Sequence, residues 1–449
     1  MEILTSLPQF GNLFLTLAAF VVALSVIVAV HEYGHYIVGR WSGIKAEVFS
    51  LGFGPVLFSR MDRHGTRWQI AALPFGGFVK FLGDADAASG KDGAAMAALP
   101  PERLRQTMHG APLWARTATV AAGPIFNFIL SIVIFSAVMM TGGKTADPLT
   151  VGALKPLPVA GITLEPGDRV LSIEGQPLPD VAAGEVYDDM IDALPRVALL
   201  DYRVERAGRE IEATGPQLMP PLISGLAPQS AAFAADLEAG DVITAVNGTP
   251  IVAFEELKVV VEGSNGAPLT LTVWREGRGT HEVSITPRRV DEPQPEGGFR
   301  TEWRIGIAGG MAFEPATERL GLIEAVGDAV AQIGDIIQSS LSGLYHMITG
   351  AISSCNMSGP IGIAQVSGAM ASQGAQSFIW FIAVLSTAVG LLNLFPVPVL
   401  DGGHLVFYAY EAVAGRPPSE RALRVLMTVG LTLILSLMLF ALFNDIFCP

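Results

Sequence analysis

The chain has 449 residues, half of them hydrophobic, and its 42 acidic and 28 basic residues give a formal net charge of −14. It is too long for one ordinary domain and too apolar for a purely soluble protein, and an acidic chain lacks the basic face that nucleic-acid binding requires. We therefore expect a membrane protein with a soluble part and no nucleic-acid partner. Cys355 and Cys448 belong to no C-x-x-C or Cys/His cluster, so we expect isolated thiols.

The first 40 residues contain an apolar run from Leu13 to Val30, close to the roughly 20 residues needed to cross a bilayer. No Lys or Arg precedes Arg40, and no small-residue cleavage signal follows the run, so it lacks the features of a removable signal peptide. Residues 1–40 are predicted to form a retained first transmembrane helix.

The sequence His31-Glu32-Tyr33-Gly34-His35 follows this run directly. On a continuing helix, His31 and His35 share one face, about 6 Å apart along the axis, where both imidazoles can bind one zinc ion. Glu32 points elsewhere and can act as general base on a metal-bound water. The alternative is a set of interfacial polar residues that only close a hydrophobic helix, but ionisable groups bordering a membrane helix usually mark a functional site. A zinc site then needs a third protein ligand.

Residues 41–116 are predicted to form a cytoplasmic, membrane-associated β region and loop. Ten basic residues from Arg40 to Arg116 place this segment in the cytoplasm by the positive-inside rule. Gly52 and Gly54 could align an extended substrate, although the residues alone favour a tight turn. We expect an Ala/Gly-rich loop at 85–99 and short strands at 45–51, 55–60, 67–73 and 76–81.

Residues 117–142 are predicted to form the second transmembrane helix. Its first turns contain Gly123-Pro124-Ile125-Phe126-Asn127, where small residues let a neighbouring helix approach and Asn127 can hydrogen-bond across the interface. We expect Asn127 to serve packing and not catalysis.

The segment from about Asp147 to Arg289 has a soluble composition and contains an internal repeat. Residues 164–175 match residues 237–248 without gaps, at an offset of 73 (237 − 164), in the pattern L-E-x-G-D-x-h-x-x-h-x-G with h apolar. The pattern resembles the helix end, turn and strand of PDZ domains. We therefore expect two tandem PDZ-like α/β modules, at 147–216 and 217–290.

PDZ domains bind peptides by adding an extended strand beside a groove. The carboxylate-binding loop of the second module is expected at Ile223-Ser224-Gly225-Leu226, with Val151-Gly152 as a weaker counterpart in the first. Lys155-Pro156-Leu157-Pro158 departs from the expected groove-flanking sequence of the first module. The modules could equally serve only to exclude large substrates by bulk.

Residues 291–375 are predicted to form an outer, amphipathic helical linker, because apolar residues recur at helical spacing from Ile323 to Ile337. The third transmembrane helix is predicted at 376–403, although Pro396 and Pro398 break its helical part before Asp401. A fourth is predicted at 422–444.

Asp401 is a carboxylate at the end of a membrane span and the best candidate for the missing metal ligand, with a helix cap as the alternative and His404 as the second-ranked ligand. Asn393 offers an amide that can hold an extended substrate strand. Four spans would return both termini and the PDZ-like modules to the outer side and leave His31, His35 and Asp401 in the cytoplasmic half of the bilayer.

With HEYGH on the first span, NLFPVPVLDGG after the third and PDZ-like modules between the second and third, the whole chain resembles the site-2 protease family of intramembrane zinc metalloproteases. The resemblance implies Zn²⁺ bound by His31, His35 and Asp401. It also implies that Glu32 is the general base, that Asn393 engages the substrate backbone, and that Gly52 and Gly54 form the family's Gly-x-Gly element in its membrane-associated β region.

The family's role would be to cut single-span membrane proteins in the bacterial inner membrane, such as an anti-sigma factor whose outer domain another protease has removed, and to clear remnant signal peptides. Two other classes of function are open. One is a membrane scaffold or receptor whose modules bind protein tails and whose metal site is inactive, and the other is a metal transporter that uses His and Asp at mid-membrane.

Overall fold

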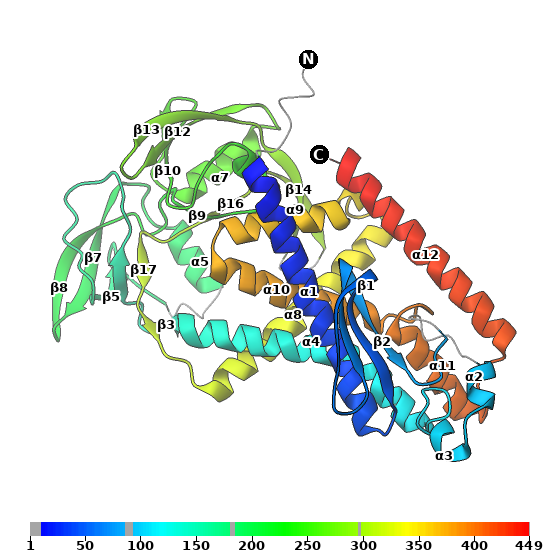
Figure 1. Cartoon of the computed structure of the whole chain (residues 1–449). Helices are drawn as coiled ribbons and strands as arrows, with labels where there is room; N and C mark the ends of the chain where they lie inside the picture. The colour runs from blue at the N-terminus through cyan, green and yellow to red at the C-terminus, as the bar shows by residue number, and fades with distance from the viewer. Residues whose placement is uncertain (1–9, 86–92, 180–184, 295–297, 449) are drawn as a thin grey trace. The chain divides into compact units, whose positions relative to one another are not determined.

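The computed structural model describes residues 10–85, 93–179, 185–294 and 298–448 (Figure 1). By its contacts the chain divides into two compact units. Unit 1 comprises Met1–Val138, Leu322–Tyr345 and Ser354–Pro449, and unit 2 comprises Met139–Gly321 and His346–Ser353. Two parts of the predictions lie outside the described residues. They are residues 1–9 of the predicted first span and residues 86–92 of the predicted loop at 85–99.

Four helices in the described part of the chain are long and apolar enough to cross a membrane, which confirms the four predicted spans. Pro396 and Pro398 lack the N–H that continues a helix, so the third span ends at Leu394 and Asp401 begins a separate helix, α11 (Asp401–Ala414). The four are α1 (Phe10–Trp41), α4 (Leu113–Gly142), α10 (Ala375–Leu394) and α12 (Glu420–Phe447).

The predicted helical linker at 291–375 is wrong in its first part, where the chain forms strands up to Glu318. The amphipathic helix α8 begins only at Leu322 and ends at Ile348, and α9 follows at Pro360–Ser372. Residues 307–309 and 313–315 of this part pair with strands of the two modules, and Ile305 and Phe313 are buried in the module cores without a helix. Three short helical segments complete unit 1: α2 (Gly93–Ala97), α3 (Pro101–Leu104) and η2 (Ser354–Asn356).

The β region of unit 1 is a hairpin of two long strands, β1 (Ala46–Met61) and β2 (Arg67–Phe81), beside α1 (Figure 1). Both strands fold back, so residues 48–51 pair with 67–70 on one side and 77–80 on the other, while 56–61 pair with 67–71. The four predicted strand segments are therefore present. Gly52 and Gly54 lie at the bend of β1 with φ of +87° and +82°, where glycine avoids the strain of a Cβ.

Unit 2 contains two four-stranded antiparallel sheets with separate hydrophobic cores. The first has the order β6-β5-β7-β8 and the second β11-β10-β12-β13. The first sheet consists of β5 (Arg169–Ile173), β6 (Gln176–Pro177), β7 (Leu199–Arg206) and β8 (Arg209–Pro216), with α5 (Glu185–Asp192). The second consists of β10 (Val242–Val246), β11 (Thr249–Pro250), β12 (Leu269–Arg275) and β13 (Gly279–Ile285), with α6 (Ala231–Ala234) and α7 (Phe254–Gly263).

The sequence repeat corresponds to a structural repeat. Glu174-Gly175 and Asn247-Gly248 make the turns after β5 and β10 with nearly identical φ values, +50° and +75° against +49° and +76°. Each module also buries the aspartate of the repeat, Asp168 or Asp241, against an arginine at the end of the third strand of its sheet.

Each module is completed by a strand from the segment after Pro293. β16 (Ile307–Gly309) pairs with β9 (Ile223–Leu226), and β17 (Phe313–Pro315) pairs with β4 (Val151–Leu154). The expected carboxylate-binding loop at Ile223–Leu226 is therefore wrong: Ile223 is fully buried in a strand, because its apolar side chain joins the core of the second module. Two further antiparallel pairs are β14 (Arg288–Pro293) with β15 (Phe299–Arg304) and β3 (Lys144–Thr145) with β18 (Thr317–Glu318).

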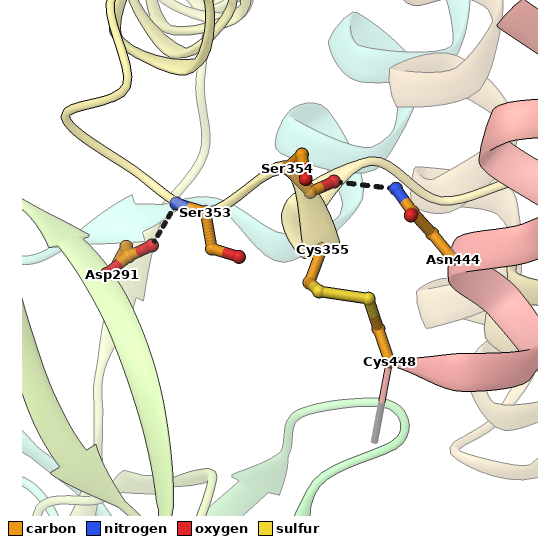
Figure 2. The surroundings of a disulfide bond; sticks show 6 residues. All are labelled: Asp291, Ser353, Ser354, Cys355, Asn444 and Cys448. Atoms are coloured by element: carbon orange, nitrogen blue, oxygen red, sulfur yellow. Dashed lines mark hydrogen bonds between the residues drawn. A yellow bond between two sulfur atoms is a disulfide. The ribbon is translucent and has the colours of Figure 1, made fainter.

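Cys355 and Cys448 form a disulfide in unit 1, so the expectation of isolated thiols is wrong (Figure 2). Their sequence separation of 93 hides their proximity. Asn444 on the last turn of α12 donates to the carbonyl of Ser354 at 2.7 Å beside the bond. On the other side of Ser354, the N–H of Ser353 donates to Asp291 of β14, within unit 2.

Candidate metal centre

His31, His35 and Asp401 converge at one point in unit 1. His31 Nε2 lies 3.2 Å from His35 Nε2 and 3.2 Å from Asp401 Oδ2, and His35 Nε2 lies 3.5 Å from the same oxygen. Within the described residues this is the one group of three or more His, Cys, Asp or Glu side chains spaced to hold a metal ion. Two imidazoles and a carboxylate, with room for a fourth ligand, form the donor set of a catalytic zinc site. Asp401 Oδ2 is buried without a hydrogen-bond partner, which fits an oxygen that binds a metal ion.

The α1 helix brings His31 and His35 to the site as the four-residue spacing predicted, and α11 brings Asp401 on its first residue. The first turn of α11 packs closely on the segment that precedes it. A Cβ on Gly402 would lie 2.3 Å from the carbonyl oxygens of Leu394 and Phe395, and one on Gly403 would lie 2.3 Å from that of Val397. The two glycines therefore let the chain turn tightly enough to present Asp401.

Helix α4 forms a cradle for both imidazoles. A Cβ on Gly123 would lie 2.3 Å from His35 Nε2 and 2.8 Å from His31 Cε1, so only glycine leaves space for the rings. His35 Nδ1 lies 2.8 Å from the backbone oxygen of Thr119. His31 Nδ1 lies 3.2 Å from the side-chain amide of Asn127, which is fully buried.

Glu32 is held by the last segment of β2. The backbone N–H of Val79 faces its carboxylate. A Cβ on Gly77 would lie 3.1 Å from Glu32 Cγ, so the strand approaches this side chain as closely as a glycine permits. The β hairpin therefore fixes the carboxylate beside the metal-binding group without using it as a ligand.

A cavity of about 270 Å³ contains His31, Glu32, His35 and Asp401 in its wall. Asn393 also lines it, with its Nδ2 donating to the backbone oxygen of Val389 at 3.0 Å. His404, the second-ranked ligand, lines the same cavity, but the carboxylate of Asp401 is the group that joins the two imidazoles. Gly52 and Gly54 are not among the residues that line it.

Sequence reasoning missed several residues around the cavity. Arg116 on α4 makes two hydrogen bonds, of 3.0 and 2.6 Å, to the carboxylate of Glu411 on α11, and its guanidinium lies 5.2 Å from the centre of the Tyr408 ring. This pair joins the helix that cradles the imidazoles to the helix that carries Asp401. His109 also lines the cavity, with Nε2 3.5 Å from the buried Asp84.

The arrangement provides three candidate metal ligands and an adjacent carboxylate. The amino-acid sequence of the chain also matches known proteins over nearly its whole length. The profile of peptidase family M50 matches residues 19–437. A Rhizobium meliloti protein named "Putative zinc metalloprotease" is 37% identical over 436 residues, covering 97% of both chains. The regulator of sigma-E protease RseP of Salmonella typhimurium is 32% identical over 457 residues, covering 96% of this chain and 98% of that protein.

Proposed function

Because the chain belongs to peptidase family M50, the site-2 proteases, we propose that it cuts single-span membrane proteins at a zinc ion held by His31, His35 and Asp401. The family membership makes it a zinc metalloendopeptidase, and with four apolar helices it is a protein of the bacterial inner membrane. The observation that carries the assignment of the site is the convergence of two imidazoles and a carboxylate from α1 and α11, 366 residues apart in sequence (401 − 35).

Zinc, when bound, lowers the pKa of a water molecule and polarises the scissile carbonyl. Glu32 is the candidate general base, because it lines the same cavity as the candidate ligands, with Gly77 and Val79 of β2 beside it. In that role its carboxylate takes a proton from the attacking water and passes it to the leaving amine. Asn393 is the candidate for holding the substrate backbone in the cavity wall.

A transmembrane helix is a poor substrate because its backbone is fully hydrogen-bonded, so it must become extended before cleavage. The β hairpin offers backbone groups with which an extended strand can pair. Gly52 and Gly54 are proposed to assist at the bend of β1, where their φ values let the edge turn. Exposed apolar side chains on this hairpin, such as Leu57 at 71% and Phe58 at 62%, suit contact with lipid.

The substrates we propose are an anti-sigma factor with one span and remnant signal peptides, supported by the likeness to a regulator of sigma-E protease. The two modules of unit 2 are proposed to be PDZ-like and to lie on the periplasmic side with both termini. The disulfide between Cys355 and Cys448 supports this sidedness for the end of α12, because such bonds persist in oxidising compartments. Arg416 before α12, with Arg421 and Arg424 in its first turns, supports a cytoplasmic position for the other end of this helix.

The test is the Glu32→Gln variant in membranes that contain a tagged single-span reporter. We expect cleavage of the reporter to fall to background while the purified variant retains one zinc ion per chain. A scaffold or a metal transporter would not cleave the reporter, so the substitution would cause no loss of cleavage. Cleavage at the wild-type rate by Glu32→Gln would show that the base, and with it the proposed mechanism, is wrong.

A further inference from the structure

The side-chain amide of Asn127 faces His31, but only one of its two polar atoms has a partner. Its Nδ2 lies 3.2 Å from His31 Nδ1, while its Oδ1 is buried with no hydrogen-bond partner. Asn127 is 0% exposed, so water does not satisfy that oxygen at the surface. An unpaired amide oxygen in such a place costs about 1–3 kcal/mol.

The protonation of His31 decides which amide atom should face it. His31 Nε2 is the ring atom that points to His35 and Asp401, so binding a metal there requires that Nδ1 carry the proton. An Nδ1–H and an amide NH₂ are both donors and cannot hydrogen-bond to each other. Turning the amide by 180° exchanges two atoms of nearly equal size, directs Oδ1 to the Nδ1–H and leaves no orphaned acceptor.

We propose that Asn127 is a positioning residue for the metal site, whose Oδ1 accepts a hydrogen bond from His31 Nδ1–H and fixes the tautomer and direction of the ring. This inference rests on the proposed role of His31 as a ligand. Hydrogen bonds from metal-binding histidines to a neighbouring acceptor orient the ring and strengthen the ligand.

The second imidazole is held in the same way by the same helix. His35 Nδ1 lies 2.8 Å from the carbonyl oxygen of Thr119, which can only accept, so His35 also carries its proton on Nδ1 and leaves Nε2 for the ion. Thr119 and Asn127 lie eight residues apart on α4 (127 − 119), on either side of Gly123. One helix therefore supplies an acceptor for each histidine and the open space between them.

Packing alone does not account for an amide at this position. The hydroxyl of Ser386 donates to the backbone oxygen of Asn127 at 2.9 Å, and the hydroxyl of Ser131 on α4 donates to the carbonyl of Ala383 on α10 at 2.8 Å, so contact between α4 and α10 is fixed without the Asn127 side chain. An apolar side chain of similar volume would fill the same space and avoid the desolvation of a polar group. The amide is explained by the imidazole that it faces.

The experiment compares metal binding by the full-length chain, purified in detergent, as wild type, Asn127→Leu and Asn127→Asp. After removal of metal, each protein is titrated with Co²⁺, whose visible absorption reports the coordination, and then with Zn²⁺ in competition. Asn127→Leu removes the acceptor and should weaken binding by about 10–100-fold. Asn127→Asp keeps an acceptor oxygen toward Nδ1–H and should bind within a few-fold of wild type.

Ser386→Ala is the matched control, because it loses a hydrogen bond to Asn127 at the same helix contact but leaves the side-chain amide intact. It should bind Co²⁺ as the wild type does. If the melting temperature of Asn127→Leu shows that this variant does not fold, Asn127→Ala is used in its place. Equal Co²⁺ affinity of wild type and Asn127→Leu, or equally weak binding by both folded Asn127 variants, would overturn the inference. A wild type that binds no stoichiometric ion would instead overturn the proposed metal site itself.

Discussion

Substitution of Gly123 by alanine tests the cradle that α4 forms for the two imidazoles. The added Cβ would lie 2.3 Å from His35 Nε2, whereas ordinary contact begins at 3.4 Å, so the ring or the helix must move by about 1.1 Å (3.4 − 2.3). Zinc–ligand distances tolerate only about 0.2 Å. Movement of α4 instead of the ring would break the contacts that Thr119 and Asn127 make with the histidines.

Helix propensity acts in the opposite direction and is too small to compensate. Alanine favours a helix over glycine by about 1 kcal/mol, which would stabilise α4. A misplacement of 1 Å in a catalytic site costs about 100-fold in rate. We therefore expect Gly123→Ala to lose at least that much in kcat/KM on a single-span reporter and to retain far less than one zinc ion per chain.

The control is Gly142→Ala on the same helix, whose Cβ would meet nothing within 4 Å. It lies on the last residue of the helix, gains at most the same helix propensity, and should keep zinc and activity. The assay pairs metal analysis of the purified proteins with reporter cleavage at equal protein levels. Full zinc occupancy together with wild-type cleavage by Gly123→Ala would refute the reasoning from the cradle.

Two further predictions concern the modules and the disulfide. Burial alone would raise the pKa of Asp168, but hydrogen bonds from Arg206 and from the N–H of Glu165 lower it overall. Its contribution to stability is therefore complete above the unfolded value of about 3.9 and is lost as the pH falls below it. Asp168→Asn should lower the hydrogen-exchange protection factors of β5 at neutral pH and reduce the further loss of protection that acid causes, and an acid response equal to that of wild type would contradict this. Cys355→Ser opens a loop of 93 residues and should lower thermal stability in detergent by roughly 2–4 kcal/mol, whereas an unchanged melting temperature would show that Asn444 and its neighbours suffice.

Local signals in the sequence were sufficient to single out the candidate metal ligands. The HEYGH spacing fixes two imidazoles on one helix face, and the two prolines before Asp401 predict a break that presents a carboxylate at the end of a span. The repeat at 164–175 and 237–248 predicts two similar modules because the same turn residues recur at the same offset. These features depend on neighbours within a few residues.

Features that depend on distant partners were not predictable from one sequence. Asn127 has the appearance of a helix-packing residue until His31 is placed beside it, and the pairing of Arg116 with Glu411 spans 295 residues. Strands β16 and β17 lie in a segment whose apolar spacing gave no sign of the modules they complete. The disulfide was missed for the same reason, since nothing near Cys355 indicates Cys448.

The segment that carries β16 and β17 adds one strand to each module, and this limits how far the two modules can move apart. Only residues 310–312 lie between β16, which belongs to the second module, and β17, which belongs to the first. Three residues span at most about 11 Å even when extended. A fragment that stops at the end of the visible repeat, near residue 290, would leave β9 and β4 without their partner strands, one in each module. An excised fragment should therefore extend through Glu318 for the two modules to fold as a pair.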